Sequence, residues 1–173
     1  MKKSIFILAL LIGGNTLIAQ NLTMGQILEI KKKDLGNTDD FLTSKGWEFF
    51  EASEPAWDKM GSVIFIYNKN YITMTAESFL TFFYDKFSDN KRVNIEVHKK
   101  EKYTEYVNTI KGYGCKMISS RVENGRIVKV YRGATTTFEI QTESSENIYN
   151  EETAGWSFFI ASNDDYDLIR GDE

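Results

Sequence analysis

The chain has 173 residues, of which 25 are acidic and 21 basic, giving a net charge of −4 at pH 7. This length allows one domain with a sizeable core or two small fused units. The acidic balance argues against a nucleic-acid partner, because phosphates require a basic surface. A hydrophobic content of 42%, with 14% aromatic residues, excludes a disordered chain.

The segment 1–19 has the pattern of a cleavable export signal. Lys2 and Lys3 precede an apolar run at 5–12, which is shorter than the roughly 20 residues of a membrane-spanning helix. Ala19 offers a small residue at the cleavage edge. We therefore expect export from a Gram-negative bacterium to the periplasm or beyond, with no stable membrane insertion afterwards. Cleavage removes two lysines and makes the net charge more negative.

Helical and strand patterns follow in turn. Thr23 and Gln26 have capping-box spacing and predict the start of a helix. Asn37 or Thr38 is expected to cap a second short helix, which Gly46 closes. Apolar residues then recur at every second position, which predicts four strands joined by hairpins at 47–52, 62–68, 76–85 and 92–98.

The second half shows a similar order. Apolar residues between 103 and 113 recur at helical spacing and predict an amphipathic helix. Asn124 and Gly125 predict a tight hairpin, and 143–153 is expected to be a mobile acidic loop. Strands are predicted at 116–122, 127–131, 135–142 and 155–162.

Two matches between the halves indicate an internal repeat. Tyr103 and its surroundings echo Tyr166, and Gly46 echoes Gly114, in the same order and at similar offsets. Cys115, the single cysteine, then lies at the start of a strand, where we expect it to be buried and structural. One cysteine cannot form an intramolecular disulfide.

These patterns predict an α+β architecture. Two tandem α-β-β-β-β units, at 22–98 and 99–168, are expected to form one largely antiparallel sheet of about eight strands. The helices are expected on one face of this sheet. Residues 169–173 are expected to form a flexible C-terminus.

This element order, with its internal repeat, resembles the β-lactamase-inhibitor-protein-like group. The resemblance covers nearly all of residues 22–168 and implies exported tandem modules with helices on one side of an antiparallel sheet. Some members bind an enzyme on the concave sheet face, and a related single module occurs in a small lipoprotein of the outer-membrane barrel assembly machinery. The chain also looks like a family of uncharacterised exported bacterial proteins. No residue motif accompanies the likeness, so it assigns no binding residue.

Few residues suggest catalytic or metal chemistry. His98 and Glu96 share one face of a predicted strand and could serve acid–base work, although the basic residues nearby equally fit a solvated polar face. The acidic run at 163–167 lacks the glycine turn and bidentate acid of a calcium loop, so the start of a helix is preferred. We therefore expect no catalytic residues, no metal ligands and no cofactor.

The aromatic strands suggest a binding surface. The strand at 76–85 is apolar on both faces. Phe79 and Phe83 can pack beneath the helices, which leaves the alternate set of side chains in need of a partner. Either loops cover this second face as an ordinary core, or its side chains form an exposed patch that binds a partner. The expected binding residues are Phe50, Leu80, Phe82, Tyr84, Tyr131 and Phe159.

The leading hypothesis is an exported, non-enzymatic binding module that recognises a protein or peptide through the sheet face, as an inhibitor or immunity protein would. The alternative is a small-ligand or lipid carrier whose aromatic strands line a cavity. A lone histidine and a lone cysteine offer few nucleophile–base pairs, so an enzyme ranks third. The sequence does not indicate the oligomeric state.

Overall fold

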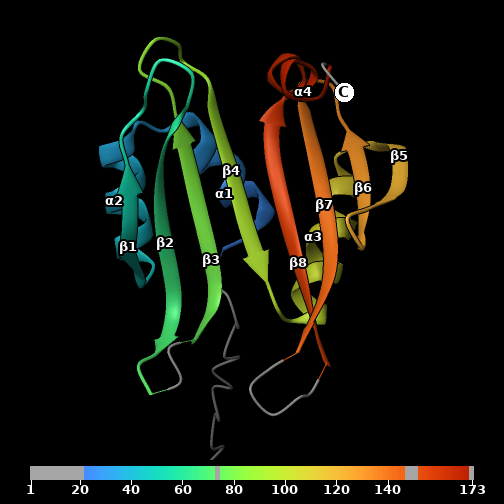
Figure 1. The fold of residues 1–173 in the computed structure, drawn as a ribbon, viewed down its shortest axis with the longest axis horizontal. Coiled ribbons are helices and arrows are strands. Elements are labelled where there is room, and N and C mark those ends of the chain that lie inside the picture. Colours follow the sequence, from blue (N-terminus) through green and yellow to red (C-terminus); the bar gives the residue numbers. More distant parts are fainter. Residues whose placement is uncertain (1–21, 73–74, 147–151, 172–173) are drawn as a thin grey trace, which may run out of the picture.

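The computed structural model describes residues 22–72, 75–146 and 152–171, and the predicted export signal at 1–19 lies outside this part. Within it the chain forms four helices and eight strands (Figure 1). None of these helices is long and apolar enough to span a membrane. In chain order the elements are α1 (Met24–Lys32), α2 (Leu35–Ser44), β1 (Trp47–Ser53), β2 (Gly61–Asn70), β3 (Thr75–Tyr84), β4 (Lys91–Val97), α3 (Lys100–Gly112), β5 (Lys116–Glu123), β6 (Arg126–Arg132), β7 (Thr136–Glu146), β8 (Glu152–Ser162) and α4 (Asn163–Arg170).

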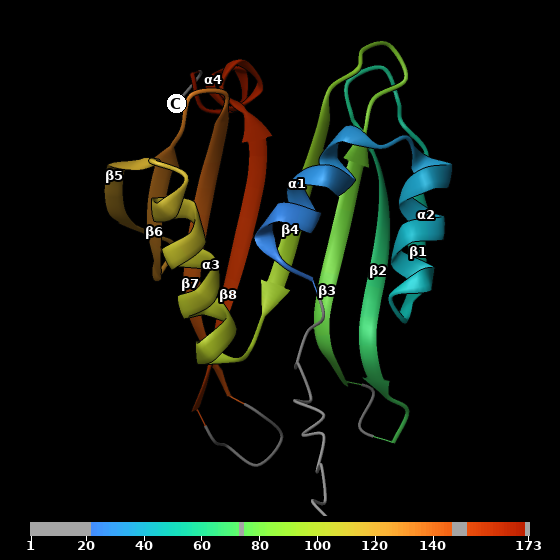
Figure 2. The same cartoon turned by 180° about the vertical axis from the view of Figure 1, so that it is seen from behind.

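The strands form one antiparallel sheet in the order β1-β2-β3-β4-β8-β7-β6-β5. Each half of the chain is a four-stranded meander, and the meanders meet where β4 pairs with β8. Helices α1, α2 and α3 lie against one face (Figure 2). We call the other face, which carries Phe79, Asn94, Glu139 and Phe159, the open face. The predicted antiparallel α+β sheet is confirmed, but α4 lies on the open face, so the helices are not all on one side.

Local capping residues set the helix starts. Thr23 accepts a hydrogen bond from the Gln26 backbone, and the Gln26 side chain accepts one from the Thr23 backbone, which confirms the predicted capping box. The predicted caps of α2, Asn37 and Thr38, were wrong. Asp34 caps that helix because its carboxylate accepts from the Asn37 backbone at 2.8 Å. An acidic cap also suits the positive end of the helix.

A left-handed glycine precedes each edge strand. Gly46 has a φ of +80° ahead of β1, and Gly114 has a φ of +78° ahead of β5. At the same distance beyond each glycine the edge strand contains a β-bulge, at Phe50 and at Ile118. Bulges interrupt the hydrogen-bond ladder of an edge strand and discourage pairing with another chain. The correspondence follows the predicted match between Gly46 and Gly114, while the repeat itself stays a prediction.

If a two-fold axis related the two halves, equivalent residues of β4 and β8 would pair with each other. The observed register between these strands has this property. Ile95 pairs directly with Phe158, and these positions have the same offset along the chain as Tyr103 and Tyr166. Helices α3 and α4 follow the two strands, but they pack on opposite faces of the sheet. The two halves therefore differ in the placement of the helix that follows the last strand of each half.

The main core lies between the sheet and helices α1 to α3. The Tyr106 ring meets Phe158 edge-on at a centroid distance of 5.3 Å, and its hydroxyl donates to the Leu22 carbonyl at 2.9 Å. These contacts join α3 and the N-terminal segment to the middle of the sheet. Other central residues, all buried, are Ile27, Leu42, Phe65, Ile95, Phe138 and Ile160.

The predicted face assignment of β3 was wrong. Leu80 and Phe82 are fully buried beneath the helices, whereas Phe79 and Phe83 lie on the open face. Tyr131 is buried in the same core and cannot belong to an exposed patch. Both sets of alternating side chains in β3 are apolar, so a period of two does not reveal which set meets the helices.

The hairpins of the second half are partly as predicted. Asn124 and Gly125 have φ values of +50° and +77°, which confirms the predicted tight turn between β5 and β6. Strands β7 and β8 extend into the predicted loop at 143–153, so most of that segment is a hairpin. Its remainder, 147–151, lies outside the described residues.

We expect Phe82→Ala to lower the free energy of unfolding by about 3–5 kcal/mol, because it removes a fully buried ring from the core. Phe50→Ala removes the same atoms from a ring that is 49% exposed, and should cost about 1 kcal/mol. Urea unfolding followed by circular dichroism measures both changes. Equal losses would contradict the placement of one ring in the core and the other at the surface.

Candidate binding cleft

Helix α4 was predicted only in part. The run at 163–167 begins the helix as expected, but the helix continues to Arg170, so the predicted flexible C-terminus at 169–173 starts too early. Ser162 caps the helix by accepting a hydrogen bond from the Asp165 backbone at 3.3 Å. The acidic residues thus lie in the first turn, where the helix dipole favours negative charge.

Two bidentate arginine–aspartate pairs hold α4 on the open face. Arg92 of β4 binds Asp165 at 2.8 and 2.9 Å, and the Asp165 side chain is only 3% exposed. Arg132 of β6 binds Asp167 at 2.6 and 2.7 Å, but Asp167 is exposed. Because solvent screens the second pair, the desolvated pair contributes more to holding the helix.

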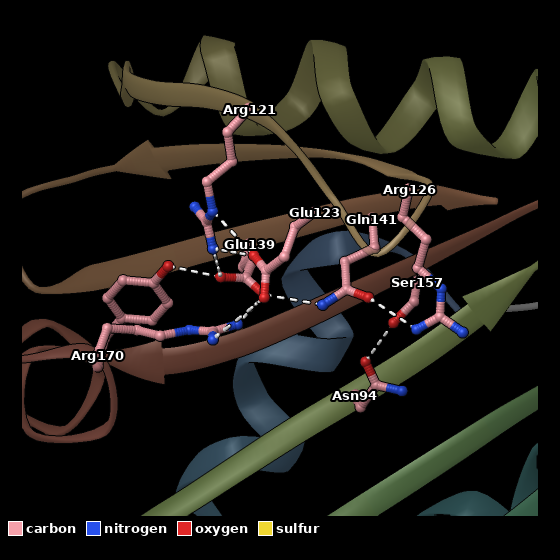
Figure 3. Close-up of polar contacts among 9 residues, drawn as sticks. Asn94, Arg121, Glu123, Arg126, Glu139, Gln141, Ser157 and Arg170 are labelled. Carbon is pink, nitrogen blue, oxygen red and sulfur yellow. Dashed lines mark hydrogen bonds and ion pairs between the residues drawn. The ribbon is translucent and has the colours of Figure 1, made fainter. Parts of the chain in front are cut away.

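A buried carboxylate, Glu139 of β7, forms the centre of a hydrogen-bond network under α4 (Figure 3). It accepts from Tyr166 at 2.6 Å, from Arg170 at 2.7 Å and from Gln141 at 2.9 Å. Arg121 of β5 approaches it at 3.5 Å. One side chain therefore links α4 to the strands of the second half.

The protonation states in this network are set by its contacts. Burial alone would raise the pKa of Glu139, but hydrogen bonds from Tyr166, Gln141 and Arg170 outweigh it and hold this pKa below its ordinary value of 4.5. Burial and the hydrogen bond to Glu139 raise the pKa of Tyr166 to about 12. At neutral pH Tyr166 is therefore a donor and Glu139 an ionised acceptor.

Beside α4, the open face contains a cleft of about 500 Å³. Its floor consists of Asn94 and Glu96 from β4 with Ser157 and Phe159 from β8. The cleft therefore lies over the junction of the two halves, and α4 forms one end of it. Its sides include Phe83, Arg92, Arg126, Gln141, Glu143 and Ile169.

Hydrogen bonds hold the polar groups of the cleft in place (Figure 3). The Ser157 hydroxyl donates to the Asn94 amide oxygen at 2.6 Å. On the other side Arg126 donates to Gln141 at 3.4 Å and pairs with Glu143 at 2.6 Å. A ligand would meet side chains whose positions are already defined.

Glu96 is the carboxylate of the cleft floor, and its environment disfavours the ionised form. Burial raises the pKa of Glu96 above its ordinary value of 4.5; His98 opposes the rise, Glu143 adds to it and Arg126 opposes it. Glu96 is only partly buried, so its charge keeps some contact with solvent.

The predicted binding residues divide between the two sides of the sheet. Phe159 lies on the cleft floor, and Phe50 is on the open face, 6.4 Å from Phe79 between ring centroids. Tyr84 is partly buried and stacks beside Phe82 on the helix side. Those that belong to the core, and so correct the prediction, are Leu80, Phe82 and Tyr131.

Sequence reasoning missed most of the cleft. Asn94 and Ser157 were not predicted as binding residues, nor were Ile169 and Arg170 of α4. The alternation of β4 already put Asn94 and Glu96 on one face, and this was the available signal. It did not show that β8 would complete the floor.

Of the remaining candidates for chemistry, His98 is exposed just beyond β4. It is close enough to Glu96 to oppose the rise that burial causes in the pKa of that carboxyl, but it does not line the cleft. Cys115 is buried as predicted, and burial raises the pKa of its thiol, which makes it a poor nucleophile. The part of the chain that the structure describes contains no group of three or more His, Cys, Asp or Glu side chains that could hold a metal ion.

Comparisons with protein-family models, with curated proteins and with solved structures found no match. The resemblance to the β-lactamase-inhibitor-protein-like group therefore stays a prediction. The assignment of function depends on the geometry of the cleft.

We expect Glu139→Gln to lower the free energy of unfolding by about 2–4 kcal/mol, because it deprives the buried Tyr166 hydroxyl and the partly buried Arg170 of an ionised acceptor. The matched control is Glu143→Gln, on the same strand and face. Its pair with Arg126 is 49% exposed on both sides, so the change should be below about 0.5 kcal/mol. Chemical denaturation of the two variants measures the difference, and similar values would contradict the proposed role of Glu139.

The same carboxylate predicts a pH dependence. Folding lowers the pKa of Glu139 below 4.5. The stability that the ionised carboxylate contributes is therefore present above pH 4.5 and is lost as the pH falls below that value. Between about pH 5 and pH 3 the wild-type protein should lose more stability than Glu139→Gln. Thermal melting of both proteins across this range tests this; parallel pH profiles would show that Glu139 does not carry the effect.

Proposed function

We propose that this protein is an exported, non-enzymatic binding module that recognises a protein or peptide through the open face of its sheet. The observation that supports this most is the cleft over the β4–β8 junction, where hydrogen-bonding side chains and Phe159 share one floor. Protein-recognition sites combine such placed polar groups with aromatic anchors. Among the helices that the structure describes, α4 lies on the open face and covers one end of it (Figure 1).

An apolar strip continues from the cleft across the first half of the sheet. Its members are Phe50, Ile64, Phe79 and Phe83, each at least partly exposed on the open face. Lys69 lies over the Phe50 ring, 5.7 Å from its centroid, and marks a charged rim. A partner segment several residues long would contact both the strip and the cleft.

The charges of this face do not suit a nucleic acid. Arg92, Arg126 and Arg170 each pair with a carboxylate of the protein. Binding to a phosphate backbone needs basic groups that can neutralise phosphates. The net charge of −4 adds repulsion.

A small polar ligand is the second candidate. The volume of about 500 Å³ falls within the range of about 300–1,000 Å³ found for small-molecule sites. Arginine and glutamate side chains make up half of the lining, so an aliphatic lipid tail would have to desolvate them. The predicted alternative was a small-ligand or lipid carrier, and this lining favours a small polar ligand over a lipid.

Export and an inhibitor or immunity role belong to the same proposal. Export is supported by the signal-like pattern of the segment 1–19. An inhibitor acts by occupying the surface of another protein and needs no catalytic group. The two-unit repeat is supported by the matched glycines and bulges of the edge strands and by the β4–β8 register.

Affinity capture from the native cells, with cross-linking and mass spectrometry, tests the open face directly. We expect Thr81→Arg, which places a charged side chain on the open face of β3, to abolish capture of a partner that wild-type protein retains. Thr43→Arg, on the exposed side of α2, should retain it.

Partners that all three proteins retain equally would contradict recognition through the open face. A small molecule that co-purifies with wild-type protein in native mass spectrometry, and is lost in Thr81→Arg, would instead favour the second candidate.

A further inference from the structure

A groove on the helix side of the sheet contains a partly buried lysine, Lys31, which makes no ion pair with any residue that the structure describes. We infer that this groove binds a small monocarboxylate, with the carboxylate beside Lys31 and an apolar part along Leu28 and Tyr113. Helix α1, which carries Lys31, lies on the face of the sheet opposite the cleft (Figure 2), so this binding does not depend on recognition through the open face.

The groove consists of two adjoining hollows of about 550 Å³ and about 220 Å³. Helix α1 lines one side of it, and the residues that follow α3 and the hairpin between β6 and β7 line the other. The two hollows share Leu28, Tyr113, Thr135 and Thr136. The larger one also contains Lys31, Lys32 and Ser162, and the smaller one Cys115 and Phe138. One end of the groove is therefore charged and the other more apolar.

Hydrogen bonds fix the hairpin that forms one wall of the groove. The Asn163 side chain donates to the carbonyls of Gly133 and Ala134 at 3.2 and 3.1 Å. Its amide oxygen accepts from the Thr137 hydroxyl at 2.8 Å. The Gly133 backbone amide also donates to the Thr136 carbonyl at 2.9 Å. A ligand would therefore meet a wall that is already in place, which lowers the entropic cost of binding.

The environment of Lys31 favours a negatively charged ligand. Burial lowers the pKa of Lys31 below its ordinary value of 10.5; Asp165 opposes this change and Lys91 adds to it. The Asp165 carboxylate makes two hydrogen bonds to Arg92 and forms no ion pair with Lys31. A carboxylate beside Lys31 would compensate the desolvated ammonium group without displacing an existing partner.

The hydroxyl groups of the groove can donate to the same carboxylate. The Ser162 hydroxyl accepts from the Asp165 backbone, which leaves its own hydrogen to donate. The hydroxyl oxygens of Thr135 and Thr136 lie 3.4 Å apart. One hydrogen bond between them uses one of their two hydrogens and leaves the other for a ligand. The lysine and the hydroxyls together favour a ligand that accepts hydrogen bonds.

The charge of the lining matches a carboxylate better than a phosphate. Lys32 pairs with Glu29 at 2.8 Å, so Lys31 supplies the uncompensated positive charge of the larger hollow. A carboxylate carries one negative charge, whereas a phosphate group carries about 1.5–2 negative charges at pH 7. A phosphate would leave part of its charge without a cation.

The apolar part of the ligand has a surface on which to pack. Leu28 and Tyr113 line both hollows, and Phe138 and the Cys115 thiol line the smaller one. Burial raises the pKa of that thiol, so it is uncharged at neutral pH. The volume of the larger hollow lies in the range of about 300–1,000 Å³ found for small-molecule sites. A short aliphatic chain or an aromatic ring therefore suits this groove.

Titration of the purified protein with hexanoate, phenylbutyrate and indoleacetate, followed by amide NMR, tests this site. We expect at least one of these carboxylates to shift the signals of Thr135 and Thr136. The alcohol of the same skeleton should bind about 10- to 100-fold more weakly, because it lacks the charge that pairs with Lys31. Lys31→Gln should weaken the carboxylate by a similar factor and should stay folded, since it breaks no ion pair among the described residues. The matched control, Lys111→Gln on the exposed side of α3, should leave binding unchanged.

The wild-type comparison of acid and alcohol needs no variant, and equal binding of the two would overturn the inference. Absence of shifts with all three carboxylates, or tighter binding of phenyl phosphate than of any of them, would also overturn it. Thr81→Arg should leave carboxylate binding unchanged, and Lys31→Gln should leave capture of a protein partner unchanged. Failure of this site is therefore distinguishable from failure of the open face.

Discussion

The hydrogen-bond ladder between β4 and β8 holds the two halves of this protein together. It runs from the pair Val93–Ile160 to the pair Val97–Trp156 and joins two four-stranded meanders into one sheet. Without it each meander would present an unpaired edge and an open side to its core. Ile95 and the residues beside it lie at the centre of the helix-side core, while their neighbours on the other face form the cleft floor. One ladder thus positions both the main core and the floor of the cleft.

Helix α4 covers one end of the open face and forms one end of the cleft. A helix of eight residues is not stable in isolation, so its contacts with the sheet must hold it. The apolar contacts under it are few, mainly Tyr166 with Val130 and Ala161. The buried polar groups, Asp165 with Arg92 and Glu139 with Tyr166, therefore carry much of the attachment. Removing one member of such a pair lowers the free energy of unfolding, because the other member is left buried without a partner. The position of α4, and with it one end of the cleft, therefore depends on these pairs.

The helices that follow β4 and β8 differ in composition, and this difference creates the asymmetry of the molecule. Helix α3 directs Tyr106, Val107 and Ile110 into the main core. Helix α4 has acidic residues in its first turn and meets arginines on the open face instead. If the halves share one origin, the second has kept the strand frame and changed the helix after it. The change gives the sheet a partly covered face with a cleft beside α4.

Signals within a few residues of one another were sufficient to predict the element types, the capping box at Thr23, the helix end at Gly46 and the Asn124–Gly125 turn, because each depends on local backbone preferences. The antiparallel sheet followed from the alternation of apolar residues. Long-range packing was needed for the rest. Leu80 and Phe83 are both apolar, and only the position of the helices buries one and leaves the other on the open face. The cleft likewise exists only because β8 pairs with β4. This pairing brings Ser157 to Asn94 from a distant part of the chain, and no local sequence pattern predicts that contact.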